Sequence, residues 1–242
     1  MLSAMHVDAA SDEPAGKPER RALADWTLAR LHEMVFSGEL RPGDALIEMD
    51  LTQRLAVSRS PLRDALKQLE HSGLVEVDAV NGRRILRPFL AADVAELYDI
   101  RRELEALGVA RTAEDPSPAV IAALEQSLGA MEAAVDAPIE VWIPSDFAFH
   151  AQLSESSGAR RLPHLLRGIW VQHQALLRRM ALVGSYPSTK SERLDVIADH
   201  RRILLGISNR APAEAQQAIR HHLDRRREIV MRALHERGDA GV

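Results

Sequence analysis

The sequence contains no cysteine, which excludes a disulfide framework and a thiolate metal site. This absence fits a reducing cytoplasm, and we expect a cytoplasmic protein. The sequence also lacks any apolar run near the ~20 residues that a membrane-spanning helix requires, so no membrane partner is expected. The first residues do not show the basic segment and apolar segment of a signal peptide. Residues 1–19 are rich in acidic, small, proline and glycine residues and are expected to form a flexible tail.

Apolar residues make up 46% of the 242 positions, which is enough to bury the core of one large domain or two modest ones. The formal net charge of −4 does not by itself indicate a nucleic-acid partner. For such a partner the relevant quantity is the local charge of the contacting surface. The basic residues therefore have to be considered element by element.

Residues 20–88 show the pattern of three short helices followed by a hairpin. A first helix is predicted by apolar residues at helical spacing, and a second is predicted to begin with Asp50 as its N-cap. The third follows in AVSRSPLRDALKQLEHSG, where leucines and alanine form an apolar stripe. Apolar residues then flank Asn81-Gly82, a strong hairpin signal. This order of elements is that of a winged helix-turn-helix.

From residue 89 onward the strand signals are absent and helical spacing continues. Prolines and glycines divide this part into segments, which predict an all-α bundle of about six helices. Pro138 and Pro144 are predicted to precede the helix that contains the segment SDFAFH. The expected fold is mainly α, with a winged helix-turn-helix domain at residues 20–88 and a helical domain at residues 89–242.

The third predicted helix carries cations on the face opposite its apolar stripe. Arg59, Arg63 and Lys67 recur at four-residue spacing. A helix with such a face can lie in the major groove of DNA, with its cations on phosphates or guanine edges. The same charge spacing is also typical of a solvated helix face. The hairpin adds Arg83 and Arg84, which can reach the DNA backbone or minor groove, and this combination favours DNA binding.

The segment SGELRPGDALIEMDLTQRLAVSRSPLRDALKQLEHSGLVEV, followed by NGRRI, resembles the DNA-binding domain of the GntR regulators. Its most specific part is VSRSPLRDAL. The resemblance implies that Arg59, Ser60 and Arg63 contact DNA and that Gly82 is the glycine of the wing tip. Members with an arginine early in the second helix use it on DNA. The matching position here is near Met49, which cannot make that contact.

The segment SDFAFH places Asp146 four residues before His150. On a helix the two side chains lie on one face, one turn apart, where they can hold a metal ion or form an ordinary ion pair. His200 and His222 lie beside apolar residues of later helices, so both are expected to point inward. Inward histidines from three helices are costly unless they are paired or bound to metal. The other histidines, His173 among them, are expected to be surface or internally satisfied residues.

Four segments of the C-terminal half resemble the FCD ligand-binding domain of the FadR subfamily of GntR regulators: AADVAELYDIRRELEALGVARTA, SDFAFHAQLSESSG, ADHRRILLGI and RHHLDRRR. That domain is an antiparallel helical bundle, and six helices resemble its shorter, VanR-like branch. Many members bind a divalent metal through one Asp and three His, which implies Asp146, His150, His200 and His222 as ligands. An Asn often follows the Ser-Gly of the second segment, where this chain has Ala159; that departure concerns the helix end more than ligation.

The resemblance also implies an effector. Three imidazoles and one carboxylate suit Zn²⁺, Ni²⁺ or Mn²⁺, and in this family the open coordination positions commonly take water or the carboxylate of a small organic acid. Arg101, in the motif YDIRRELE, is the candidate to pair with that carboxylate. An ion pair between Arg101 and Glu105, four residues later, is an equally good interpretation.

We therefore expect a homodimeric transcription regulator that reads a palindromic operator and responds to a small acid at a metal-containing site. Repression relieved by the effector is the commoner behaviour in the family. Three alternatives stay open: the metal is the only effector or is structural, the chain is a metalloenzyme with a DNA-binding head, or Asp146 and His150 form a metal-free ion pair. The chain has no HExxH motif and no obvious general base beside the ligands, which argues against the enzyme.

Overall fold

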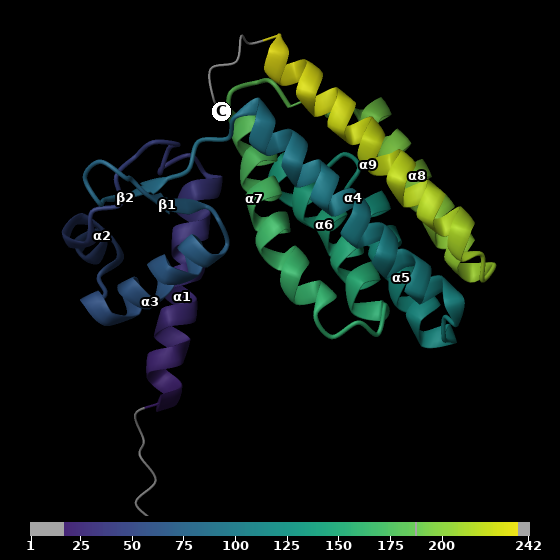
Figure 1. Ribbon diagram of the computed structural model, residues 1–242, viewed down its shortest axis with the longest axis horizontal. Coiled ribbons are helices and arrows are strands. Elements are labelled where there is room, and N and C mark those ends of the chain that lie inside the picture. The colour runs from purple at the N-terminus through teal and green to yellow at the C-terminus, as the bar shows by residue number, and fades with distance from the viewer. Residues whose placement is uncertain (1–16, 187, 237–242) are drawn as a thin grey trace, which may run out of the picture.

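The computed structural model describes residues 17–186 and 188–236. The predicted tail of residues 1–19 lies outside this part as far as residue 16, and helix α1 (Lys17–Phe36) begins three residues before the expected boundary. The described chain has an N-terminal head, from α1 to β2, and a C-terminal bundle, from α4 to α9 (Figure 1). None of its helices combines the length and the apolarity that a membrane span requires.

The head has the order of elements that the sequence predicted for a winged helix-turn-helix. Helix α3 packs against both α1 and α2, and its leucine stripe is fully buried between them. The wing is an antiparallel pair in which Val75 lies opposite Leu86. Gly82 lies in the loop between the strands with φ +68°, a left-handed conformation that favours glycine. The remaining elements of the head are α2 (Glu48–Leu55), α3 (Arg59–His71), β1 (Val75–Val77) and β2 (Arg84–Leu86).

Helix α2 begins earlier than the sequence predicted. Its N-cap position is Ile47, whose carbonyl accepts a hydrogen bond from Leu51 N–H, so the prediction that Asp50 is the N-cap is wrong. Asp50 lies in the first turn, where the helix dipole favours a carboxylate, and it pairs with Arg54 at 3.2 Å. Arg54 also pairs with Glu39. The charge of this arginine is therefore neutralised within the head.

The bundle contains six helices in the described chain, as predicted, so the fold is mainly α. Helix α4 runs through its centre and packs against α6, α7, α8 and α9, while α5 lies against α6 and α8 (Figure 1). A single apolar core extends through these helices. Their bounds are α4 (Ala91–Glu114), α5 (Pro118–Ala133), α6 (Ile139–Ser156), α7 (Leu162–Leu182), α8 (Lys190–Ser208) and α9 (Pro212–His235).

Helix α6 corrects the prediction that both prolines precede it. Pro138 is the N-cap, but Pro144 lies inside the helix. A proline has no N–H, so the carbonyl four residues earlier loses its helical donor. That carbonyl belongs to Glu140, and Arg178 of α7 donates to it at 3.3 Å. A side chain of the neighbouring helix thus satisfies the group that the proline leaves free.

The head rests on the bundle through α7. Gly73, the predicted stop of the third helix, follows the C-cap Ser72 and has φ +76°. A Cβ at Gly73 would come within 2.6 Å of Gln172 Nε2, and a Cβ at Gly168 would lie 3.4 Å from Ser72 Cα. Gly168 and Gln172 are one turn apart on α7. Helix α3 of the head therefore ends directly against one face of a bundle helix.

Candidate metal site and DNA-binding surface

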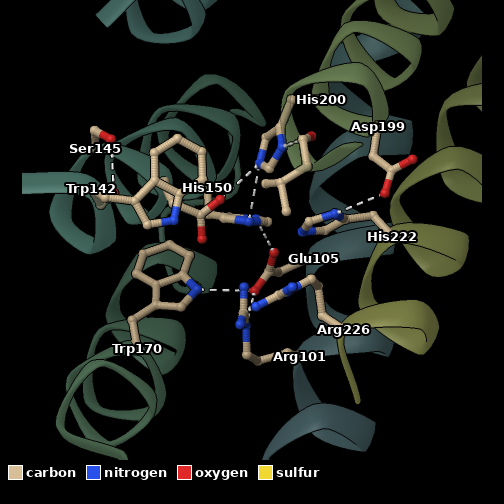
Figure 2. A network of polar contacts seen from close by, with 12 residues as sticks. Arg101, Glu105, Trp142, Ser145, His150, Trp170, Asp199, His200, His222 and Arg226 are labelled. Atoms are coloured by element: carbon tan, nitrogen blue, oxygen red, sulfur yellow. Dashed lines mark hydrogen bonds and ion pairs between the residues drawn. The ribbon is translucent and has the colours of Figure 1, made fainter. Parts of the chain in front are cut away.

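The structure brings the four candidate ligands together inside the bundle. Asp146 and His150 lie on α6, His200 on α8 and His222 on α9; each offers a ligand atom, and these atoms all lie within 4.8 Å of one another. His200 Nε2 is 3.3 Å from His150 Nε2 and 3.4 Å from Asp146 Oδ1. The three rings are buried and point toward one another (Figure 2). Helical spacing predicted that the three histidines face inward, and the resemblance to a known family implied that the four residues belong together.

Each ring also has an oxygen close to its outer nitrogen. Glu105 Oε2 lies 2.6 Å from His150 Nδ1, and Asp199 Oδ2 lies 3.5 Å from His222 Nδ1. His200 Nδ1 lies 2.7 Å from the carbonyl of Val196 and donates its proton there. Such outer partners fix the tautomer of a histidine and leave Nε2 with a free lone pair. The sequence analysis did not assign Asp199 a role, although it directly precedes His200.

Burial keeps two of the three histidines, His200 and His222, neutral at physiological pH. Burial lowers the pKa of His200 to about 4, although the charge of Asp146 acts in the opposite direction. Burial likewise lowers the pKa of His222 well below its ordinary value, against the effect of Asp199. Metal ligation requires the neutral imidazole. Three imidazole rings and a carboxylate that share one small volume are a donor set for a divalent transition metal.

Arg101 forms the ion pair with Glu105 that the sequence analysis offered as one of two interpretations. The pair is buried, with Arg101 Nε 2.6 Å from Glu105 Oε1, and Trp170 Nε1 donates to the same oxygen at 2.9 Å (Figure 2). Burial alone would raise the pKa of Glu105, but the charge of Arg101 and the contact with His150 hold it well below the usual range. A continuous polar chain therefore runs from Arg101 through Glu105 to a candidate metal ligand.

His173 is buried rather than on the surface, and only one of its two ring nitrogens has a hydrogen-bond partner in the described chain. It is buried on α7, its Nδ1 contacts Arg101 Nη1, and its ring meets the ring of Tyr98 edge-on at 4.4 Å. Its position beside Arg101 was missed. The available signal was its spacing, because His173 follows Trp170 by three residues on the apolar face of α7.

Arg226 is a second buried arginine that the sequence analysis missed. It lies on α9 one turn after His222, so both face the bundle interior. Its Nη2 donates to the hydroxyl of Tyr186 at 3.1 Å. Within the described chain no carboxylate lies at ion-pair distance from its guanidinium. The signal was its position four residues after an inward histidine and four before the buried Val230.

Most of the candidate DNA contacts are exposed, and they lie on helix α3 and on the wing of the head. Arg59, Arg63 and Lys67 are solvent-exposed on α3, Ser60 is half-buried at its first turn, and the wing adds the exposed Gly82 and Arg83. Arg63 Nε lies 2.8 Å from Glu48 Oε2 of α2. Arg84 of the wing pairs with the same Glu48 and with Glu70. The Arg63 pair is solvent-exposed and therefore weak, so a phosphate or base group can replace it, whereas the Arg84 pairs are half-buried.

Comparisons with known proteins agree with this architecture. Residues 23–85 match the model of the bacterial regulatory proteins of the gntR family, and residues 96–225 match the FCD domain. The HTH-type transcriptional regulator YdhC of Bacillus subtilis is 30% identical over 210 residues, which cover 86% of this chain and 90% of YdhC. The regulator LutR of the same organism is 31% identical over 206 residues, covering 78% of this chain and 93% of LutR.

Two solved structures share the fold. E. coli McbR/YncC superposes with a TM-score of 0.72 at 20% identity, covering 87% of this chain and 97% of that one. A putative GntR transcriptional regulator from Rhodococcus sp. RHA1 superposes with a TM-score of 0.69 at 22% identity, covering 88% and 99% of the two chains. The head and bundle, the two family matches and the full-length relatives lead to one conclusion: the chain belongs to the gntR family of bacterial regulatory proteins with an FCD domain and is a DNA-binding transcription regulator, not an enzyme.

Proposed function

We propose that this regulator senses a small carboxylate through a divalent metal bound by Asp146, His150, His200 and His222. The observation that carries the proposal is the convergence of these four donors within 4.8 Å in a buried site. Three imidazoles buried against one another are unfavourable without a shared partner. A divalent metal is such a partner, and Zn²⁺, Ni²⁺ and Mn²⁺ all suit these donors.

A metal in this site would supply a positive centre with positions open to an effector carboxylate. The residues of the chain supply the rest. Glu105 and Asp199 hold two of the rings in place and make them more basic. Arg101, fixed by Glu105, has guanidinium donors left to orient an acid group beside the metal. The site would then act as a sensor, because Arg101 can orient an acid that binds beside the metal.

The head supplies the output of the sensor. We propose that α3 reads the major groove with Arg59, Ser60, Arg63 and Lys67, while Gly82 and Arg83 of the wing follow the adjacent backbone. A homodimer places two such heads on a palindromic operator. Effector binding changes the placement of the heads with a coupling free energy of ~1–3 kcal/mol, and we propose relief of repression as the result. Six bundle helices support a place in the VanR-like branch of the FadR subfamily.

The test compares two histidines that are neighbours in the sequence. His222→Ala removes a proposed ligand, whereas His221→Ala changes an exposed residue on the same helix. We expect purified wild-type protein and His221→Ala to contain one equivalent of metal per chain, and His222→Ala and His200→Ala to contain little. We also expect EDTA to lower the melting temperature of wild-type protein and His221→Ala only.

Each result decides between the alternatives. Full metal content in His200→Ala and His222→Ala would overturn the ligand assignment. Metal content without any acid that changes operator affinity would favour a metal that is structural or the only effector. No metal in wild-type protein, and no change on EDTA treatment, would leave Asp146 and His150 as an ordinary polar contact.

A further inference from the structure

The bundle interior beside the proposed metal ligands contains hydrogen-bond donors without acceptors. An arginine only donates, so His173 Nδ1 must accept from Arg101 Nη1. The proton of neutral His173 is then on Nε2, and burial keeps this ring neutral because it lowers the pKa well below the ordinary value. His173 Nε2 and Arg101 Nη2 are both buried and have no hydrogen-bond partner in the described chain. Unmet buried donors are costly, so both require an acceptor.

Arg226 adds a second guanidinium to the same place. Arg101 and Arg226 both lie close enough to the buried Tyr98 to oppose the rise in its pKa that burial causes. Both also lie close enough to His173 to lower its pKa, in addition to the lowering that burial causes. Figure 2 shows the two side chains directed at the region around Glu105. Of the two arginines, Glu105 forms an ion pair in the described chain with Arg101 and not with Arg226. Two buried like charges with one bonded carboxylate form a site for an additional anion.

The charges of the buried side chains around this site indicate how many negative charges the anion should carry. The cations Arg101 and Arg226 are matched by Glu105 and Asp146, so the four groups carry no net charge. Asp199 belongs to a separate outer group, because Arg225 lies 2.8 Å and Arg202 lies 3.1 Å from it. A divalent metal would therefore leave two positive charges in excess. Buried charge is stable only when it is compensated, and a monoacid would compensate half of it.

We propose that the effector is a small organic acid with two acid groups, one placed at the metal and the other between Arg101 and Arg226. The inference rests on the proposed function, since it assumes the metal. Arg226 follows His222 by four residues, a rise of about 6 Å along the helix. Arg226 is therefore the next inward side chain after a proposed ligand, which favours a short diacid over a long one. His173 Nε2 is the additional donor that lies beside the second group.

The experiment uses metal-loaded full-length protein and matched pairs of probes. Malonate, succinate and glutarate are each compared with their own monoamide, which keeps length and shape but removes one negative charge. Binding is measured by calorimetry and by the shift in melting temperature at about pH 7.5. We expect at least one diacid to bind tenfold or more tightly than its monoamide.

Arg226 is tested with a neighbouring control. Arg226→Gln removes the charge but keeps a donor for Tyr186, and it should lower the affinity for the diacid about tenfold or more while the affinity for the monoamide stays the same. Arg227→Gln removes an arginine that is 40% exposed and faces Asp99, and it should change neither affinity. Arg226→Lys should keep the preference for the diacid. Circular dichroism and metal content show whether each variant is folded and loaded.

The outcomes separate this inference from the proposed function. Equal binding of diacid and monoamide, or an unchanged preference in Arg226→Gln, overturns the inference while the metal sensor stands. Failure of every diacid to bind metal-loaded protein overturns it as well. Diacid binding that survives complete removal of the metal supports the role of Arg226 and overturns the metal part of the proposed function. If Arg226→Gln does not fold, Arg226→Lys and the wild-type comparison still decide the matter.

Discussion

At the scale of the residue, Asp199 links the candidate metal site to the outside of the bundle. Its carboxylate is buried and lies 3.5 Å from His222 Nδ1, while Arg225 and Arg202 reach it from the surface. Burial would raise the pKa of Asp199, but the contact with His222 and the charge of Arg225 together outweigh burial and lower it. The carboxylate is therefore ionised, and it fixes which nitrogen of His222 faces the other ligands.

Replacement of Asp199 tests this orienting role. Asp199→Asn should lower metal affinity about 10- to 100-fold, which is the usual effect of losing the outer partner of a histidine ligand. Competition with a coloured chelator measures the affinity. Asp195→Asn is the matched control, because Asp195 is exposed one turn earlier and pairs with the same Arg225 at 3.5 Å. Equal affinities for the two variants would contradict the role assigned to Asp199.

The buried histidines also predict how the stability of metal-free protein depends on pH. The pKa of His200 is about 4 in the folded protein and about 6.5 in an unfolded chain. The unfolded state takes up the proton more readily than the folded state. The contribution of neutral His200 to the free energy of unfolding is therefore fully present above pH ~6.5 and decreases as the pH falls toward 4. His200 alone contributes roughly 3 kcal/mol to that loss.

Urea unfolding of EDTA-treated protein between about pH 8 and pH 4.5 measures this dependence. Glu105 acts in the same direction at lower pH, because its folded pKa is lowered. His200→Gln should flatten the profile between about pH 6.5 and pH 4.5. A stability that stays constant across that range in wild-type protein would show that the ring is not held neutral.

At the scale of the element, α7 is the helix that contacts both functional parts. One face carries His173, which touches Arg101 inside the bundle. The adjacent residue, Gln172, lies against Gly73, which follows the end of α3. Gly168, one turn earlier on α7, lies against Ser72. A shift or rotation of α7 on effector binding would therefore move the support of α3 directly. A single packed helix could therefore couple the interior of the bundle to α3, without a longer chain of intervening residues.

A substitution at Gln172 tests the coupling. Gln172→Ala removes the side chain that packs on Gly73 but leaves His173 and the ligands unchanged. We expect normal metal content, normal effector affinity of the isolated protein, and a ratio of operator affinities with and without effector that is reduced severalfold. Fluorescence anisotropy with labelled operator measures that ratio. Arg167→Ala, at an exposed position of the same helix, should leave it unchanged; equal ratios in both variants would exclude this contact as a route.

At the scale of the whole molecule, the proposed DNA contact uses a local basic surface on a chain whose net charge is negative. The net charge is −4, yet Arg59, Arg63 and Lys67 lie together on the exposed face of α3. Arg63→Ala should lower operator affinity by ~1–3 kcal/mol, the usual value of a base-contacting arginine, and should relax specificity at one base pair of each half-site. Arg30→Ala, an exposed arginine of α1 that pairs with Glu33, is the control. Unchanged operator binding by Arg63→Ala at moderate salt would contradict the assignment of α3.

Much of the molecule could be predicted from the sequence because its signals are local. Helical spacing, prolines and the Asn81-Gly82 pair predicted the elements, since each depends on residues a few positions apart. The four candidate ligands could be predicted as a set because Asp146 and His150 are one turn apart and His200 and His222 interrupt apolar faces. The resemblance to a known family then indicated that they belong together.

The remaining features depend on how separate helices pack. Whether Arg101 faces solvent, an effector or Glu105 is decided by the position of α7, which brings His173 and Trp170 beside it. The burial of Arg226 depends on the packing of α9 against α4. The start of α6 was misjudged because the carbonyl freed by Pro144 is satisfied by Arg178, which lies 34 positions later in the chain. Local patterns carry no information on such pairings.

Arg178 has a consequence of a mechanical kind. Its guanidinium donates to α6 at the turn that Pro144 weakens, and it also lies 4.8 Å from the ring of Phe36 at the end of α1. The weakened turn comes immediately before Asp146 and His150. One side chain is thus a brace between the head and the flexible point of the ligand-bearing helix. A load applied to the head would reach the end of α6 that carries Asp146 and His150 through this contact.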